Sequence, residues 1–274
     1  MSLMVLIRGG GDLASGVALR LHCAGLHLLI TELPQPLAVR RRVSFAEAVF
    51  QGRTSVEGVT ARLAENLSQA FDVIQQGELP VLVDPTGKSL LELRDRLPRH
   101  EPIVLVDGRM IKRSPELSMQ AAALVIGLGP GFLAGENCHA VIETKRGHNL
   151  GRVIWQGAAE KNTGIPDKFA DQASDRVLRA PADGILQAFA DIGDHLEIGQ
   201  LVVEVAGKPV VAPFRGVLRG LLFPGLRVSQ GMKIGDVDPR DDPSSCSRVS
   251  DKSMAISGGV LEAILSRPEL RPYL

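Results

Sequence analysis

The sequence predicts an α/β fold: a doubly wound, mainly parallel sheet, followed by a second, smaller all-β domain. Short runs of Val, Ile and Leu alternate with segments of helical period in the first part of the chain, and a glycine-rich repeat occupies the last part. Strands that are apolar along their whole length are buried on both faces, which is typical of parallel sheets covered by helices. We expect the α/β domain at residues 4–160, the β domain at 175–240 and a C-terminal helix at 250–266 that packs back on the body.

The α/β domain begins with a βαβ unit. An apolar run at 4–7 predicts a strand, apolar residues at helical spacing predict a helix at 12–23, and the run at 26–30 predicts the next strand. Residues 156–174 lack a hydrophobic period and predict a linker. Later runs predict further strands and helices: strands at 80–83, 103–106, 123–126 and 140–142, and helices at 63–75 and 88–97.

The repeat lies between residues 180 and 231. Seven positions recur after a shift of 32 residues, with the same residue or a similar aliphatic one: Ala180, Pro181, Gly184, Leu186, Gly193, Leu196 and Gly199, then Ala212, Pro213, Gly216, Leu218, Gly225, Val228 and Gly231. Short strands turned by glycines have this pattern. We therefore predict a small all-β unit of two similar halves, joined at 206–209.

Composition excludes several classes of protein. The 274 residues include 31 basic and 31 acidic side chains, so the net charge is zero, which disfavours nucleic acid as a partner because binding it requires a cationic surplus. No apolar run reaches the roughly 18 residues of a membrane span. Cys23, Cys138 and Cys246 have no CxxC spacing, so we expect no disulfide framework and no metal site in a cytoplasmic protein.

A glycine loop follows the first predicted strand. The spacing Gly9-x-Gly11-x-x-Ala14 matches the dinucleotide-binding fingerprint of a Rossmann-like fold, in which a phosphate group sits on the helix N-terminus. Glu32 ends the next strand, where an acidic residue accepts from a ribose hydroxyl. The alternative is a tight turn that only packs helix on sheet. The cofactor-binding candidates in this region are Gly9, Gly10, Gly11, Asp12 and Glu32.

A second glycine cluster and a polar loop follow later strands. Gly127, Gly129 and Gly131 lie in a turn whose N–H groups would form an anion nest, unless the turn is a crossover without ligand. Downstream, Arg146 is a candidate for holding an anion and His148 for holding an anion or transferring a proton, unless the loop is only a solvated turn. Because parallel strands present their carboxyl ends at one edge, we expect these loops around one crevice.

Three residues are candidates for catalysis, although the sequence identifies no catalytic pair. Glu143 ends a strand beside the polar loop, His148 lies within it, and Cys246 is the cysteine that we expect to be exposed. A thiolate at Cys246 could accept or pass sulfur or selenium, but a bystander thiol is the more common situation.

Several motifs between about residues 5 and 265 resemble those of the YqeB-type accessory proteins of selenium-dependent molybdenum hydroxylases. The resemblance implies a role in maturing such an enzyme, through its cofactor or the selenium that it carries, and brings no catalytic residues with it. The motifs are Arg8-Gly9-Gly10-Gly11-Asp12-Leu13-Ala14, Thr31-Glu32-Leu33-Pro34, Val83-Asp84-Pro85, Gly127-Leu128-Gly129-Pro130-Gly131-Phe132, Glu143-Thr144-Lys145-Arg146-Gly147-His148, Arg179-Ala180-Pro181-Ala182-Asp183-Gly184, Ser250-Asp251-Lys252 and Gly258-Gly259-Val260-Leu261-Glu262-Ala263.

The repeat also resembles the two halves of a biotinyl/lipoyl-like barrel, a barrel-sandwich in which a lysine on the central hairpin is modified. Lys208 occupies the corresponding turn. Its neighbours Gly207 and Pro209 differ from the flanks of carrier lysines, so we expect the fold without biotin or lipoate on Lys208.

We therefore expect an accessory protein for maturation of a selenium-dependent molybdenum hydroxylase, which binds an anionic cofactor, of the molybdopterin type or a nucleotide, in the crevice between the glycine loops. Its partners would be the hydroxylase client or the client's maturation proteins. The sequence leaves open whether the chain is an enzyme. Two alternatives are an NAD(P)-dependent oxidoreductase, favoured by Glu32, and a non-catalytic scaffold whose β domain docks a client.

Overall fold

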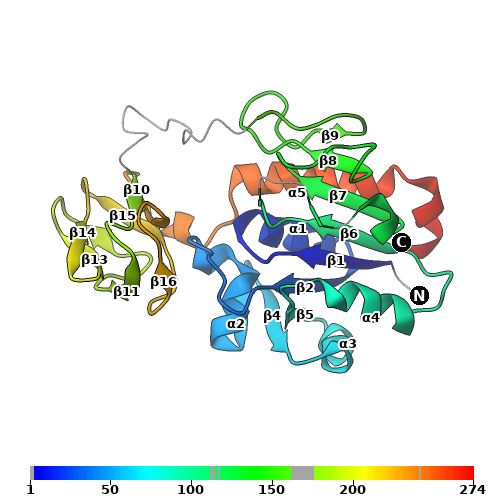
Figure 1. Cartoon of the computed structure of the whole chain (residues 1–274), viewed down its shortest axis with the longest axis horizontal. Coiled ribbons are helices and arrows are strands. Elements are labelled where there is room, and N and C mark those ends of the chain that lie inside the picture. The colour runs from blue at the N-terminus through cyan, green and yellow to red at the C-terminus, as the bar shows by residue number, and fades with distance from the viewer. Residues whose placement is uncertain (1–2, 112–114, 117, 162–175, 241) are drawn as a thin grey trace. The chain divides into compact units, whose positions relative to one another are not determined.

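The computed structural model describes residues 3–111, 115–116, 118–161, 176–240 and 242–274 (Figure 1). The chain divides into two compact units. The first unit consists of Met1–Pro36, Phe45–Thr163 and Val249–Leu274, and the second of Leu37–Ser44 and Gly164–Arg248.

A nine-stranded sheet forms the centre of the first unit. Its strand order is β3-β4-β5-β2-β1-β6-β7-β8-β9. The strands are β1 (Met4–Arg8), β2 (His27–Glu32), β3 (Arg53–Val56), β4 (Val59–Ala64), β5 (Leu79–Val83), β6 (Ile103–Asp107), β7 (Leu124–Leu128), β8 (Ala140–Ile142) and β9 (Val153–Ile154). The two edge strands, β3 and β9, pair antiparallel with β4 and β8, and the remaining pairs are parallel.

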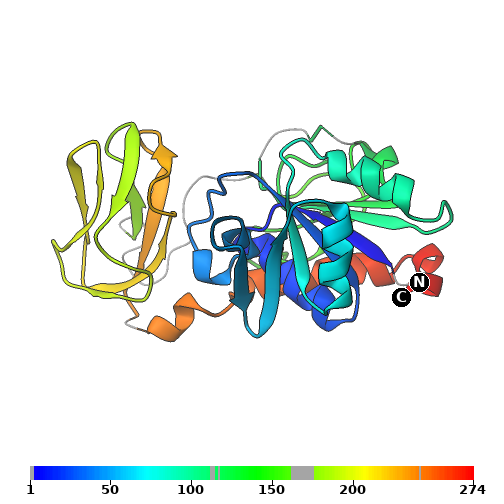
Figure 2. The same cartoon turned by 90° about the horizontal axis from the view of Figure 1, so that it is seen from below.

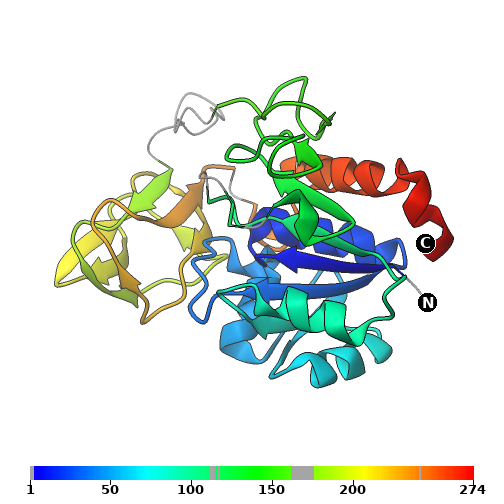
Figure 3. The same ribbon diagram turned by 45° about the vertical axis from the view of Figure 1, so that its right-hand side comes forward.

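Five α-helices accompany the sheet among the described residues: α1 (Asp12–Cys23), α2 (Ala48–Gln51), α3 (Leu67–Gln75), α4 (Lys88–Arg96) and α5 (Asp251–Leu265). Helix α1 packs along α5, which also contacts β7, β8 and β9, and α3 packs on β4 and β5 beside α4. Figures 1 and 3 show α1 and α5 side by side, and Figure 2 shows α4 on the other side of the sheet. Short 3-10 helices complete the elements: η1 (Arg41–Val43), η2 (Phe45–Glu47), η3 (Met119–Ala121), η4 (Pro243–Cys246) and η5 (Pro268–Tyr273).

Small residues allow α1 and α5 to approach closely. A Cβ atom on Gly16 would lie 2.1 Å from Ser253 Oγ, so only glycine fits there. The Ser253 hydroxyl donates to the carbonyl oxygen of Asp12 at 3.1 Å, and Ser250, the N-cap of α5, accepts from the Ser253 N–H. The C-terminal helix is thereby fixed against the helix that follows β1.

The predicted fold class is wrong. The first unit has a large mixed sheet, with antiparallel strands at both edges, in place of the doubly wound Rossmann-like sheet. Among the described residues, the connection from β6 to β7 contains only a 3-10 helix, and that from β7 to β8 contains no helix. The hairpin β3–β4 was not predicted because buried and partly exposed positions are mixed along it, so it lacks a continuous apolar run. The predicted helix at 63–75 begins only at Leu67.

The second unit contains two separate four-stranded antiparallel sheets, ordered β10-β17-β15-β12 and β14-β13-β11-β16, in place of the predicted barrel-sandwich. The strands are β10 (Val177–Arg179), β11 (Gly184–Ala188), β12 (His195–Leu196), β13 (Leu201–Val205), β14 (Lys208–Val211), β15 (Gly216–Leu221), β16 (Arg227–Val228) and β17 (Lys233–Asp238). When 32 is added to the residue numbers of β10–β13, their bounds agree with those of β14–β17 to within one residue. Each strand and its counterpart in the repeat lie in different sheets.

The segment Leu37–Ser44 groups with this second unit, although it lies far from it in sequence. The Val39 carbonyl accepts from the Leu221 N–H at 2.8 Å, and Arg41 Nε donates to the Leu221 carbonyl at 2.8 Å. A Cβ atom on Gly220 would lie 2.8 Å from the Val39 oxygen, so glycine at this position admits the segment.

No helix within the described ranges combines the length and the apolar character that crossing a bilayer requires.

Candidate functional site

The glycine loop after β1 is closed on one side and open on the other. Gly9 has a positive φ of 93°, which favours glycine. A Cβ atom on Gly10 would lie 2.8 Å from the Ala46 nitrogen, and the Ala46 N–H donates to the Gly10 carbonyl at 2.8 Å. In contrast, a Cβ atom on Gly11 would meet no atom within 4 Å. A ligand can therefore approach the loop at Gly11 and is excluded at Gly10.

Glu32, at the end of β2, already uses one donor of the loop. Its Oε2 accepts from the Gly10 N–H at 2.7 Å, and its Oε1 accepts from the Leu33 N–H at 2.7 Å. Burial raises the pKa of this carboxyl, and the two hydrogen bonds offset part of the effect. Glu32 thus acts as an internal anion for the loop, and its role toward a ribose stays a prediction.

The start of α1 retains the features of an anion site. Gly11 is the N-cap residue and supplies no side-chain acceptor to the first turn. The first N–H groups of a helix have no partner within the helix, and they carry the positive end of its dipole. Asp12, the first helical residue, is only partly buried and brings a negative charge to this position. An anion at this position would have to tolerate that carboxylate.

Charged side chains gather where β1 and its neighbour β6 end. Arg8 ends β1 and is 3% exposed, and Asp107 ends β6 and is 2% exposed. Arg109 binds Asp107 through two hydrogen bonds of 2.9 and 2.6 Å, and it also donates to Glu116 at 2.8 Å. The hydrogen bond from Arg109 lowers the pKa of Glu116 to about 2.

Arg8 is the member of this cluster with donor capacity left over. Its Nη1 lies 3.8 Å from Asp107 Oδ2 and 3.6 Å from Glu116 Oε2, and it has no hydrogen-bond partner among the described residues. Burial, followed by the charge of Arg109, lowers the pKa of its guanidinium. Buried donors are rarely left without an acceptor, so an anionic oxygen would improve this arrangement.

The loop before α4 borders the same cluster. Asp84 follows β5, and its carboxylate accepts from the Gly87 N–H at 2.8 Å and from the Ser89 N–H at 2.7 Å. A Cβ atom on Gly87 would lie 3.3 Å from Arg8 Nη2, so the backbone passes close to the guanidinium. The first turn of α4 is therefore satisfied internally, in contrast to that of α1.

Strand order explains why the predicted site residues omit this cluster. In the sheet, β2 lies on one side of β1 and β6 lies on the other, so the direction in which successive strands are added reverses between β1 and β6. Open α/β sheets bind ligands at the carboxyl ends of the strands at such a point. Arg8, Asp107 and Arg109 follow apolar runs in the sequence. A search for charged residues directly after buried strands would have found them.

The second glycine loop, after β7, is packed shut. A Cβ atom on Gly127 would lie 2.1 Å from the Phe132 ring, and one on Gly129 would lie 2.4 Å from Thr144 Oγ1. Gly129 and Gly131 have positive φ values of 71° and 109°. Since β6 separates β7 from β1, the two glycine loops are roughly 10 Å apart at the usual strand spacing.

The polar loop after β8 is organised by Glu143. This carboxylate is 2% exposed and accepts from the N–H groups of Thr144, Lys145 and Glu160 at 2.8, 2.7 and 2.8 Å. Its environment is that of a structural acceptor, whereas its catalytic role stays a prediction. Arg146 forms hydrogen bonds of 2.6 and 2.9 Å with the Asp251 carboxylate at the start of α5.

His148 is exposed. At the usual strand spacing, β8 ends roughly 14 Å from β1, because β6 and β7 lie between them.

The expectation that Cys246 is exposed is wrong. Cys246 is fully buried in the second unit, and Cys23 is the exposed cysteine. Burial raises the pKa of the Cys246 thiol although nearby arginines act in the opposite direction. Lys208 begins β14 directly after a turn at Ala206 and Gly207, and it is exposed. Whether Lys208 is modified stays a prediction.

Comparison with known proteins gives one homologue in sequence. No family model matches the chain. A protein of Escherichia coli K12 called uncharacterized protein YqeB is 45% identical over 262 residues, which are 96% of this chain. The chain has a YqeB homologue. It spans about half of that relative, 47% of its length. The match supports the resemblance to YqeB-type proteins, and the name YqeB by itself assigns no role.

Solved structures show only a distant likeness. The ectoine utilization protein EutE of Ruegeria pomeroyi is 14% identical, with a TM-score of 0.26 over 85% of this chain and 84% of that one. An aspartoacylase family protein of Mesorhizobium loti is 12% identical, with a TM-score of 0.28 over 86% and 84%. A succinylglutamate desuccinylase/aspartoacylase of Rhodobacter sphaeroides is 16% identical, with a TM-score of 0.27 over 88% and 87%. Scores this low support no conclusion about activity.

Proposed function

We propose that the chain is an accessory protein in the maturation of a selenium-dependent molybdenum hydroxylase, and that it binds an anionic cofactor, of the molybdopterin type or a nucleotide, where β1 and β6 end. The first part rests on the motifs that resemble YqeB-type proteins, and the YqeB homologue supports that resemblance without assigning a role. The hydroxylase client or its maturation proteins would be the partners.

The observation that carries the binding site is the buried Arg8 directly before the glycine loop. Its Nη1 is held near two carboxylates at 3.6 and 3.8 Å, beyond a good hydrogen bond. A phosphate oxygen could accept from this guanidinium, which forms strong bidentate contacts with such groups. The uncapped start of α1 at Gly11 offers further donors at the same end of β1.

The site can bind and orient an anion without performing chemistry. Glu143 is occupied by three backbone N–H groups, and Cys246 is buried in the second unit. We therefore assign Arg8 and the α1 N-terminus the task of holding an anionic group, and Glu32 that of fixing the loop. No reaction step is proposed.

A scaffold that docks a client is the second candidate, because one sheet of the second unit carries exposed apolar side chains. Ile185 on β11 is 44% exposed, Phe189 just after β11 is 55% exposed, and Val211 on β14 is 44% exposed. Exposed apolar groups that lie together are typical of protein interaction sites. If the Phe189→Ser variant still co-purifies with the client at the wild-type level, this candidate is wrong.

Native mass spectrometry tests the binding site. Protein made in cells that produce molybdenum cofactor should retain a pterin or a nucleotide, and Gly11→Val should lose it. The valine side chain would extend into the open side of the loop, and Gly11 has an ordinary φ of −73°, so the variant should fold. Arg8→Lys should weaken binding about ten- to a hundredfold, because the lysine keeps the positive charge but lacks the paired N–H donors of the guanidinium group.

Gly258→Ala is the matched control, since its Cβ atom also meets no atom within 4 Å and the residue lies within α5. It should retain the ligand. A nicotinamide nucleotide as the retained molecule would favour the oxidoreductase alternative. Wild-type protein that retains no ligand, or a Gly11→Val variant that retains it fully, would contradict the proposed site.

A further inference from the structure

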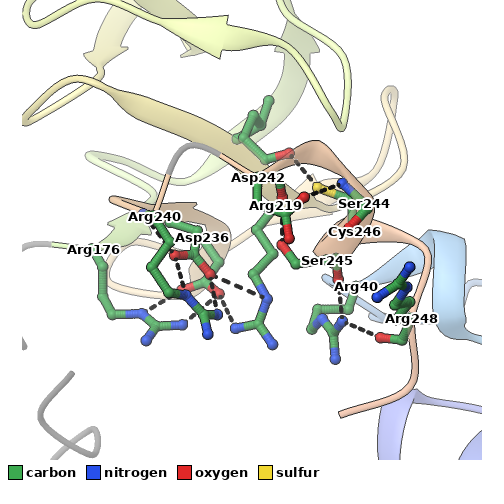
Figure 4. A network of polar contacts seen from close by, with 12 residues as sticks. Arg40, Arg176, Arg219, Asp236, Arg240, Asp242, Ser244, Ser245, Cys246 and Arg248 are labelled. Atoms are coloured by element: carbon green, nitrogen blue, oxygen red, sulfur yellow. Dashed lines mark hydrogen bonds and ion pairs between the residues drawn. The ribbon is translucent and has the colours of Figure 1, made fainter.

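The second unit contains a cluster of charged side chains along one of its sheets (Figure 4). Arg219 lies on β15, and the carboxylates of Asp236 and Asp238 lie on β17. Arg176 precedes β10 and Arg240 follows β17, and Figure 4 shows the guanidinium groups of Arg176, Arg219 and Arg240 gathered around Asp236. We call Arg176, Arg219, Lys233, Asp236, Asp238 and Arg240 the arginine cluster.

Arg176 and Arg240 each form two hydrogen bonds with one of the two aspartates. Arg176 donates to Asp236 through Nε at 3.1 Å and Nη2 at 2.9 Å. Arg240 donates to Asp238 through Nε at 2.9 Å and Nη2 at 2.6 Å. Both pairs have the bidentate geometry that uses both oxygens of the carboxylate. Each aspartate thus holds one guanidinium in a bidentate pair.

Arg219 is left without a carboxylate of its own. Its Nη1 donates a long hydrogen bond of 3.4 Å to Asp236 Oδ2, and its Nε lies 3.7 Å from Asp238 Oδ2; both oxygens also accept from another arginine. Its side chain is only 14% exposed, and its Nε has no hydrogen-bond partner among the described residues.

The surroundings of Arg219 are cationic. Burial, followed by the charge of Arg40, lowers the pKa of the Arg219 guanidinium, and the charge of Arg176 acts in the same direction. The Lys233 ammonium lies 3.7 Å from Asp236 Oδ1, on the opposite oxygen from Arg219. A partly buried guanidinium with an unused donor, beside further cations, is arranged to receive an anion.

We propose that the arginine cluster is a binding site for a phosphate group, with Arg219 as its main contact and Lys233 as a second cation. The ligand class is a small molecule with a terminal phosphate or pyrophosphate, since a guanidinium fork matches two phosphate oxygens. The site lies within the second unit and is independent of the one proposed at Arg8 in the first unit.

Calorimetric titration of the full chain with inorganic phosphate, pyrophosphate and sulfate tests the proposal. Wild-type protein should bind phosphate or pyrophosphate, and Arg219→Gln should weaken that binding about ten- to a hundredfold. Arg219→Lys keeps the charge without the fork and should have an intermediate affinity. Tighter binding of pyrophosphate than of phosphate would indicate a ligand with a diphosphate group. Equal affinities for the two would indicate a ligand with a monophosphate group.

Arg227→Gln is the matched control, because Arg227 is an exposed arginine on β16 of the other sheet. It should leave the affinity unchanged, whereas Gly11→Val should remove only the binding that arises at the site proposed in the first unit. The proposal is wrong if the wild-type protein binds neither phosphate nor pyrophosphate. It is also wrong if folded Arg219→Gln and Arg219→Lys both bind as tightly as Arg227→Gln.

Discussion

The two glycine loops of the nine-stranded sheet look alike in sequence and differ in structure. Both follow buried strands, β1 and β7, and both contain glycines at positive φ. In the loop after β1, the space beside Gly11 is empty, whereas in the loop after β7 the Phe132 ring fills the space beside Gly127. The first loop leaves room for a ligand, and the second uses glycine to pack its own side chains.

Each loop also has a carboxylate nearby, half-buried at Glu32 and buried at Glu143. Glu32, at the end of β2, accepts from Gly10 and Leu33, and Glu143, after β8, accepts from three N–H groups of the polar loop. A carboxylate that follows a strand in sequence can therefore fix a backbone turn, and it is then poorly placed to act on a substrate. Position at a strand end does not distinguish the two roles.

The largest expected effect is that of Gly127→Ala. The new Cβ atom would lie 2.1 Å from the Phe132 ring, which is 2% exposed and has no room to move away. Overpacking of a core typically costs 1–3 kcal/mol, and we expect a loss of about 3 kcal/mol in the free energy of unfolding. Urea denaturation measures it. Gly258→Ala is the control and should gain up to about 1 kcal/mol, because alanine is the better helix former.

If Gly127→Ala is as stable as the wild type, the loop after β7 is looser than the contact with Phe132 indicates, and the contrast between the two loops fails.

Glu143→Gln should have the next largest effect. The glutamine side chain would turn its NH₂ group toward an N–H donor that the carboxylate now satisfies, so at least one buried N–H would lose its acceptor. Such a loss costs about 1–3 kcal/mol. Glu160→Gln is the control, since the Glu160 side chain is 44% exposed and its carboxylate pairs with Lys145. Equal melting temperatures for the two variants would show that Glu143 is not the structural acceptor of this loop.

Apolar runs in the sequence predicted most strands of the first unit, and the repeat predicted short strands in the second without giving their positions. Strand order was not predictable in this way, because a run such as 103–106 shows that β6 is buried without showing that it pairs with β1. The Arg8–Asp107–Arg109 cluster depends on that pairing. Similarly, no local pattern shows that Phe132 folds back onto Gly127 or that η4 buries Cys246.

The smallest expected effect concerns Glu32 and its dependence on pH. Two influences oppose each other at this carboxyl: burial raises its pKa above the ordinary 4.5, and the N–H groups of Gly10 and Leu33 lower it, with burial the larger. A carboxyl whose pKa is raised on folding contributes its full stability below the unfolded pKa, and the contribution is lost as pH rises through the folded pKa. Stability should therefore fall, relative to a variant without this group, as pH increases above about 4.5.

Glu32→Gln removes the titrating carboxyl and keeps one oxygen acceptor. All other titrating groups are the same in the wild type and the variant, so they should affect the stability of both proteins equally. The difference in free energy of unfolding between wild type and Glu32→Gln should decline as pH rises from about 4 and then level off above the folded pKa. Urea denaturation of both proteins at several pH values measures it. A difference that instead grows with pH would mean that the bonds from Gly10 and Leu33 outweigh burial. Glu32 would then be a strongly held anion on the glycine loop after β1, and a ligand anion would have to compete with it there.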